Sequence, residues 1–157
     1  MGPRISVVVA VSVAVFGASS GVTSARNSHK SRTTHLAVGI ETQKLTFVDT
    51  GPSGSSPGDM FIEQDNLTRR GKPFGTAQVI CIAIAGGLAN GSAQCSGTFY
   101  LPKGQVETQG SAKSVNGSIS GAGAVTGGTR SYRGVRGSYV FHTVTGTTRA
   151  LRFSLLR

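Results

Sequence analysis

An alternation of apolar and polar residues with a period of two runs through most of this sequence. In residues 93–101, AQCSGTFYL, every second residue from Ala93 to Leu101 is apolar or small, and the residues between them are polar or amphipathic. This pattern is typical of a β-strand with one buried face. No long stretch has the three-to-four spacing of a helix, and the 23 glycines are spread along the whole chain, which disfavours long helices. The sequence therefore predicts an all-β protein.

Eight segments have the length and pattern of strands, and turn residues separate them. They are residues 36–48, 59–67, 74–85, 93–101, 105–113, 116–125, 138–144 and 148–156. No helix is expected to cover the edges of such a sheet, and closure into a barrel removes exposed edges. We therefore expect a closed eight-stranded antiparallel barrel, which is large enough to hold one small ligand.

Two of these segments carry more detail. In the first, the apolar alternation shifts by one residue between 36–40 and 45–48, which indicates a β-bulge at residues 42–44. Residues 74–85 are apolar at nearly every position, which indicates a strand buried on both faces or one that faces an enclosed cavity. Gln78 in this segment needs a hydrogen-bond partner. It is therefore a candidate ligand-binding residue, or a residue that bridges backbone groups.

The N-terminus has the features of a secretory signal peptide. Arg4 precedes an apolar run at residues 5–18, and small residues lead to Ala25. The run is shorter than the roughly 20 residues of a spanning helix, and the alternative to cleavage near Ala25 is an uncleaved anchor. We expect a secreted or periplasmic protein without membrane contact after cleavage. Its expected parts are a signal peptide at residues 1–25, a flexible basic leader at residues 26–35 and one barrel domain at residues 36–157.

Cys81 and Cys95 are the only cysteines of the chain. An even pair in an exported protein most often forms a disulfide. The alternatives are a free reactive thiol and a metal ligand, although no further ligands lie at a suitable spacing for a metal site. We expect the disulfide and no bound metal.

The chain has a net charge of +10 at pH 7, and its glycine-rich segment 124–144 contains Arg130, Arg133 and Arg136. Nucleic-acid binding needs several basic residues on one face, with aromatic rings for stacking on single strands. Arginines three apart on a strand alternate between faces, and aromatic residues make up only 6% of the chain. We expect a solvated basic surface and no nucleic-acid partner, with contact to an anionic polymer as an alternative. The segment also lacks the lysine of a phosphate-binding loop.

Three parts of the sequence, in order, resemble motifs of the allene oxide cyclase and dirigent barrel families. DNLT at residues 65–68 and FGTAQ at residues 74–78 are similar to the DPLT and VGxAQG segments of dirigent proteins. GGT at residues 127–129 with SYRGVRG at residues 131–137 resembles the signature GGTGxYxGxxG of these families.

The remaining match lies between these two in the sequence: Cys81 with CSGTFYLPKGQ at residues 95–105 resembles the pattern C…CTGTFxLPxGQ of bacterial members. The resemblance covers residues 45–144 and implies an eight-stranded barrel with an apolar cavity, often assembled as a homodimer or homotrimer. It also implies that the cavity binds a small apolar reactive intermediate and directs its ring closure or coupling by proximity. The resemblance implies no metal and no redox cofactor.

Four residues are candidate catalytic groups. The resemblance places Asp65 where the cyclases have a pocket asparagine and dirigent proteins an aspartate. It also makes Asp49 the counterpart of a carboxylate on the first strand of the cyclases. Glu63 lies on the same strand face as Asp65 and Phe61. If that face lines the cavity, the two carboxylates push their pKa values apart, which suits acid–base chemistry. Tyr100 is a candidate hydrogen-bond donor to a developing oxyanion.

The candidate ligand-binding residues are Phe61, Gln78, Phe99 and His142. A lone histidine on a strand is more often packed or exposed than a base, and DNLT around Asp65 also suits a turn. The resemblance places Cys81 near a pocket cysteine of plant cyclases, a role that a disulfide would remove. This departure disfavours allene oxide cyclisation itself.

The sequence thus predicts an exported cyclase or stereo-directing protein, and it leaves open whether the chain is an enzyme. One alternative is a non-catalytic barrel that binds a hydrophobic metabolite. Another is a secreted surface-interaction protein that acts through its basic face. Three sequons, at Asn66, Asn90 and Asn116, matter only in a host that glycosylates exported proteins.

Overall fold

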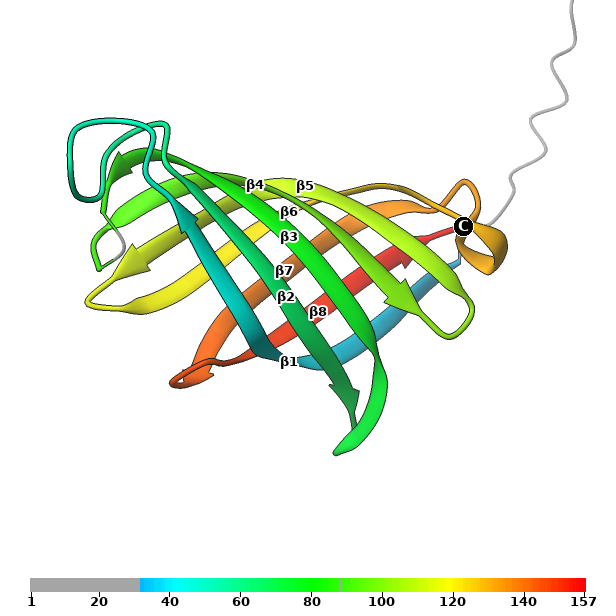
Figure 1. Cartoon of the computed structure of the whole chain (residues 1–157). Helices are drawn as coiled ribbons and strands as arrows, with labels where there is room; N and C mark the ends of the chain where they lie inside the picture. The colour runs from blue at the N-terminus through cyan, green and yellow to red at the C-terminus, as the bar shows by residue number, and fades with distance from the viewer. Residues whose placement is uncertain (1–31, 88) are drawn as a thin grey trace, which may run out of the picture.

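The computed structural model describes residues 32–87 and 89–157, which form a closed barrel of eight antiparallel strands (Figure 1). The strands are β1 (Thr33–Val48), β2 (Met60–Arg69), β3 (Lys72–Gly86), β4 (Gly91–Leu101), β5 (Gly104–Val115), β6 (Ser118–Gly128), β7 (Arg136–Thr145) and β8 (Thr148–Leu156). Each strand pairs with the next one in the chain, and β8 pairs with β1. The described residues contain a single short 3-10 helix, η1 (Arg130–Tyr132). The predicted all-β barrel is confirmed.

The longest strand, β1, closes the barrel, since its first half pairs with β8 and its second half with β2. The register with β2 shifts between Thr42 and Lys44, which confirms the predicted β-bulge. Thr42 pairs with Asp65 before the shift, and Leu45 pairs with Glu63 after it. The bulge therefore turns both Thr42 and Leu45 toward the same interior.

An apolar core fills the barrel from the end that contains η1 to its middle. Phe153 is fully buried there, and its ring meets Phe99 edge-on at 5.1 Å between centroids. Each buried side chain of this size stabilises the fold by roughly 1.5–3 kcal/mol. All eight strands contribute to the core, whose members are Leu36, Val38, Ile40, Leu67, Ala77, Phe99, Leu101, Val106, Val125, Tyr132, Val135, Tyr139, Leu151, Phe153 and Leu155.

The outer face of β3 is exposed. Ile80, Ile82 and Ile84 have exposed fractions of 46%, 44% and 59%, whereas Ala77 and Ala83 on the inner face are buried. Of the two sequence interpretations of residues 74–85, a strand facing a cavity is therefore correct and a strand buried on both faces is wrong. A single-layer barrel leaves one side of every strand in contact with solvent.

The barrel begins earlier than the sequence indicated. Residues 33–35, which the sequence predicts as part of the leader, belong to β1, because they pair with the C-terminal end of β8. The predicted signal peptide and the rest of the leader, up to residue 31, lie outside the described residues.

The glycine-rich segment 124–144 forms the corner between β6 and β7. After η1 the chain turns at Gly134, whose φ of 72° lies in the left-handed region that glycine adopts without strain. Tyr132 of η1 is buried beneath this corner. The segment therefore covers one end of the barrel and has a structural role.

Asp59 organises the loop between β1 and β2 at the opposite end. Its buried carboxylate accepts hydrogen bonds from the backbone N–H of Thr50 (3.0 Å) and of Ser56 (2.6 Å). These bonds stabilise the charged form and lower the pKa of Asp59. One carboxylate thus holds the loop in a defined conformation.

Cys81 of β3 and Cys95 of β4 are directly opposite each other and form the predicted disulfide. The disulfide closes a short loop, because the cysteines are 14 residues apart. Replacing both cysteines by alanine is expected to lower the free energy of unfolding by roughly 3 kcal/mol, chiefly because the unfolded chain gains freedom. Urea unfolding of the oxidised protein and of this variant measures the difference. Equal midpoints and slopes would contradict a stabilising disulfide.

Candidate functional site

A cavity of about 130 Å³ occupies the half of the barrel opposite η1. Its inner limit is the apolar core at Ile40, Phe99 and Leu151. Toward the other end it reaches the β3–β4 turn at Gly86 and Gly91. The cavity therefore lies inside the barrel and opens at the end away from η1.

The walls of the cavity differ in side-chain size. Small inward residues such as Ala83, Ala93 and Ala112 line it on β3 to β5. On β7, Tyr139 and Phe141 also line it. Their rings lie over β6, where Gly123 and Gly121 leave room for them, since a Cβ atom at either glycine would collide with the ring. Phe61 lies on β2. Small residues leave the space, and aromatic rings give it an apolar, defined outline.

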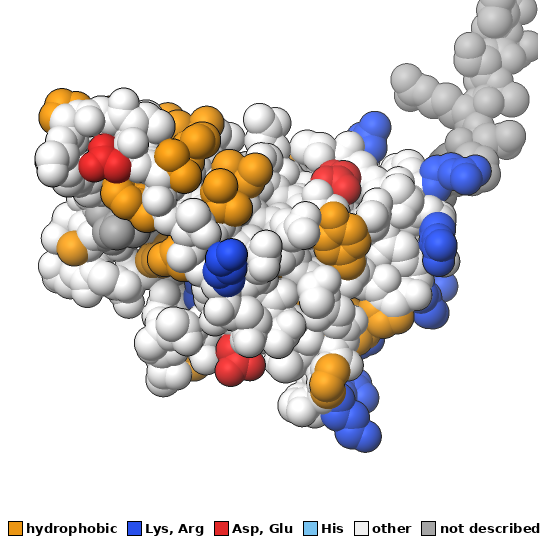
Figure 2. All heavy atoms as spheres, viewed as in Figure 1, with side chains coloured by type: hydrophobic (Ala, Val, Ile, Leu, Met, Phe, Trp, Pro, Cys, Tyr) orange, Lys and Arg blue, Asp and Glu red, His pale blue; other side chains and the backbone are white. Residues whose placement is uncertain are grey.

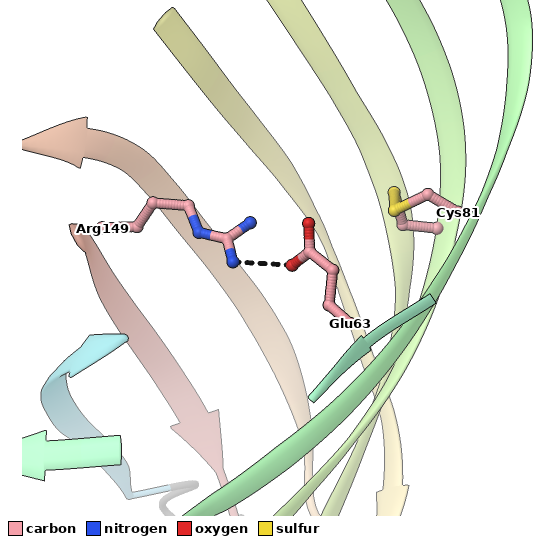
Figure 3. Close-up of a disulfide and its surroundings, with 4 residues drawn as sticks. Glu63, Cys81 and Arg149 are labelled. Carbon is pink, nitrogen blue, oxygen red and sulfur yellow. Dashed lines mark hydrogen bonds and ion pairs between the residues drawn. A yellow bond between two sulfur atoms is a disulfide. The ribbon is translucent and has the colours of Figure 1, made fainter. Parts of the chain in front are cut away.

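A cluster of charged and polar side chains lies on this largely apolar wall, and Figure 3 shows part of it. Nη2 of Arg149, on β8, donates to Glu63 Oε2 at 2.6 Å and to Asp65 Oδ1 at 3.3 Å, both on β2. The same nitrogen donates to Thr42 Oγ1 at 2.5 Å, at the bulge of β1. The side chains of Arg149, Glu63 and Asp65 are 10%, 13% and 1% exposed. We call Thr42, Glu63, Asp65 and Arg149 the polar cluster.

Asp65 is the least satisfied member of the polar cluster. Its Oδ2 atom is buried and has no hydrogen-bond partner among the described residues. Burial raises the pKa of Asp65, and the negative charge of Glu63 raises it further, against the opposing effects of the Arg149 charge and of the Thr42 hydroxyl. An aspartic acid with a raised pKa can hold a proton on Oδ2 and donate it to a ligand in the cavity.

The disulfide also faces the cavity, since both Cys81 and Cys95 line it. In Figure 3 it lies on the wall formed by β3 and β4, next to β2, which carries Glu63. Cys81 is therefore an apolar wall element and not a free pocket thiol.

The structure brings together four of the residues predicted for the site. Asp65 and Glu63 lie in the polar cluster, and Phe61 and Phe99 line the cavity. The strand face that carries Glu63, Asp65 and Phe61 does line the cavity, as the acid–base hypothesis required. Two carboxylates of unlike surroundings therefore share one apolar space.

The other four predicted residues lie outside the cavity. Asp49 is exposed in the β1–β2 loop, where it accepts a hydrogen bond from the backbone N–H of Gly54. Tyr100 and Gln78 lie on the outer face, where the Tyr100 hydroxyl donates to Gln78 Oε1 at 3.2 Å.

His142 is exposed on the outer face of β7. We therefore leave these four residues out of the site. Successive residues of a strand point to opposite faces. Three of the four, Tyr100, Gln78 and His142, follow or precede an inward residue and therefore point outward.

Sequence reasoning missed two functional candidates, Arg149 and Tyr139. Arg149 is in phase with Leu151, Phe153 and Leu155, so a lone charge on a core-facing alternation was the available signal. Burial raises the pKa of Tyr139, and a hydrogen bond with Thr108 opposes this effect. A neutral tyrosine hydroxyl is thus present on the cavity wall.

Within residues 32–87 and 89–157 no group of three or more His, Cys, Asp or Glu residues is placed to hold a metal ion. No helix in this part of the chain is long and apolar enough to cross a membrane.

Removal of Arg149 should expose its role as the counter-charge of the polar cluster. Arg149→Met is expected to lower the free energy of unfolding by about 3–5 kcal/mol at pH 7, because two carboxylates lose their partner. Arg149 opposes the rise in the pKa of Asp65, so without it the folded pKa of Asp65 rises further, and the loss should shrink as the pH falls and Asp65 takes up a proton. Urea unfolding at several pH values measures this.

The control is the triple variant Arg149→Met, Glu63→Gln, Asp65→Asn, which should recover most of the lost stability. A loss that is independent of pH and persists in the triple variant would assign Arg149 to packing alone.

Comparison of the sequence with protein-family models and with curated proteins gives no match. The structure, in contrast, is similar to several solved barrels. A pyocyanin demethylase superposes with a TM-score of 0.67 at 22% identity, covering 78% of this chain and 99% of that one. A dirigent protein, the pterocarpan synthase GePTS1, gives 0.56 at 17% identity, covering 80% and 84%.

The Diels Alderase AbmU from Streptomyces koyangensis gives a TM-score of 0.55 at 15% identity, covering 83% of this chain and 70% of that one. At these identities the likeness concerns the fold. The chain therefore has the barrel fold shared by dirigent and cyclase-type proteins.

Proposed function

We propose that this chain is a cyclase or stereo-directing protein that binds a small, largely apolar reactive intermediate in the barrel cavity. The observation that carries the proposal is the unpartnered Oδ2 of Asp65, buried in an apolar cavity beside Glu63 and Arg149. The barrel fold shared with a dirigent protein and a Diels Alderase supports it.

In this proposal Asp65 is the acid. Burial and the charge of Glu63 raise its pKa, which favours the protonated carboxyl. From that form Oδ2 donates a hydrogen bond or the proton to an oxygen that becomes negative during ring closure, and the proton returns to Asp65 as the product forms, so substrate and product are isomers. Arg149 stays charged and takes no part in proton transfer. It holds Oδ1 of Asp65 and Oε2 of Glu63 in place by hydrogen bonds. Arg149 and Glu63 are thus positioning residues that fix the direction of Oδ2.

The apolar walls supply the stereochemical control. Phe61, Phe99, Tyr139 and Phe141 surround the space with rigid rings, so a flexible intermediate can enter in few conformers. Holding one conformer with its reacting ends close together lowers the entropic part of the barrier, which can amount to several kcal/mol. This control requires no covalent bond to the protein.

The same proposal includes export. A disulfide persists in oxidising compartments outside the cytosol, and the Cys81–Cys95 bond suits such a location. The expected signal peptide at residues 1–25 would supply the route.

Demethylation of a small molecule is the second candidate activity. It is favoured by the likeness to the pyocyanin demethylase, whose chain is covered almost completely. In the cavity, two carboxylates face one arginine, so full ionisation leaves an excess negative charge that would attract a cationic ligand.

The test is incubation of residues 26–157 with a small-molecule extract of the source organism, followed by chromatography with mass detection. A compound replaced by an isomer of identical mass is the expected result. A product lighter by one CH₂ would favour the demethylase, and a compound retained and released unchanged would favour a binding barrel; both would contradict the cyclase.

Variants connect the activity to the site. Asp65→Asn is expected to lower the turnover rate by roughly 100-fold or more, since general acid catalysis contributes 10²–10⁴-fold, while the ligand still binds. Asp49→Asn, which changes an exposed aspartate outside the cavity, is the matched control and should retain full activity. Equal activity of both variants would remove Asp65 from the mechanism.

A further inference from the structure

Nine basic residues gather at the end of the barrel that contains η1. Strands that pair in chain order bring the start of β1, the end of β8 and every second turn to this one end. Figure 2 shows blue side chains concentrated along that part of the surface. All nine are exposed, and we call them the basic end: Arg32, Arg69, Arg70, Lys72, Lys103, Arg130, Arg133, Arg136 and Arg157.

No acidic side chain neutralises the basic end. Both ion pairs of the described residues belong to Arg149, inside the barrel. The chain has only six acids, and all are outside residues 1–31, so the undescribed residues cannot supply one either. Glu63 and Asp65 lie in the cavity, and the other four are on strand faces or in the β1–β2 loop: Glu41, Asp49, Asp59 and Glu107.

The fold itself makes little use of these charges. Among the described residues their side chains make few contacts: Arg69 lies over the Phe74 ring, Arg157 lies over the Tyr132 ring, and Arg136 donates to two backbone carbonyls. Like charges brought together repel one another and disfavour the compact state. A concentration of this kind therefore indicates a negatively charged partner.

The shape and composition of the basic end select the kind of partner. Its charges come from five separate parts of the chain around the barrel end, which suits an extended surface of anions better than one strand in a groove. Single-stranded nucleic acid needs free aromatic rings for stacking, but Tyr132 is buried and Phe74 lies under Arg69. That leaves one half-buried ring near this end, Tyr100, whose hydroxyl donates to Gln78. Seven of the nine residues are arginines, and one guanidinium group can donate hydrogen bonds to two oxygens of the same phosphate.

We propose that the basic end binds the surface of a phospholipid bilayer that contains anionic lipids. Each Lys or Arg held near such a surface adds to the attraction. The sequence led to the expectation of no membrane contact after cleavage, but surface binding needs no spanning segment. The chain also enters the barrel at this end, and Arg26 and Lys30 precede Arg32 with charge of the same sign.

The proposal is independent of what the cavity does. The cavity opens at the end away from η1, so the bound barrel would keep its opening toward water. A small molecule could then enter and leave while the protein stays on the membrane.

The experiment is co-sedimentation of residues 26–157 with vesicles of phosphatidylcholine and phosphatidylglycerol, and with pure phosphatidylcholine vesicles, in low and high salt. Binding is expected only with the anionic lipid, and it should weaken steeply with salt. The test variant is Lys103→Gln, Arg130→Gln, Arg133→Gln, which removes three exposed charges of the basic end. Its partitioning should fall roughly 100-fold, since each basic residue near the surface contributes roughly fivefold.

The matched control is Lys44→Gln, Lys113→Gln, Arg152→Gln, which removes three exposed charges on the outer strand faces and should bind almost as well as the parent protein. An equal loss in both variants would show a general charge effect and overturn the proposal. So would the absence of binding to anionic vesicles in low salt. Heparin or duplex DNA that displaces the protein from vesicles at equal charge concentration would identify a linear polyanion as the partner instead.

Discussion

The pairing of β1 with β8 is the constraint on which the rest of this structure depends. It turns a meander of strands into a closed barrel, so every strand has one inner face and one outer face, with no edge left unpaired. The inner faces then divide by side-chain size. Large apolar residues fill the half near η1, whereas small residues on β3 to β5 leave the opposite half hollow.

Closure also creates the polar cluster, because it brings β8 and β1 beside β2. Arg149 reaches Glu63 and Asp65 across β1, whose bulge at residues 42–44 adds Thr42 to the same group. Burying three ionisable groups is costly unless they satisfy one another, and here they do so except at Asp65 Oδ2. This oxygen can therefore form a hydrogen bond with a ligand in the cavity.

The alternation of the sequence is sufficient to predict the strands, the bulge and the shared face of Phe61, Glu63 and Asp65, because these follow from a period of two within one strand. The closed barrel was predicted from eight such segments without a helix to cover the sheet edges. It does not show which face of a strand points inward, so Phe99 and its neighbour Tyr100 were both candidates although they must point to opposite sides. Arg149 could not be found in this way, since its partners lie 84 and 86 residues away in the chain. Such a contact depends on closure between distant strands.

The most direct test of the account is a pH titration of the Asp65 side-chain carboxyl by ¹³C NMR, in the parent protein and in Glu63→Gln. The account predicts that Asp65 titrates above the ordinary value for aspartate, about 3.9, because burial disfavours its charge. It also predicts that the pKa falls in Glu63→Gln, where the repelling charge is removed. An Asp65 that titrates at or below the ordinary value in both proteins would show that Arg149 outweighs burial, and Asp65 could not then be the acid of this cavity.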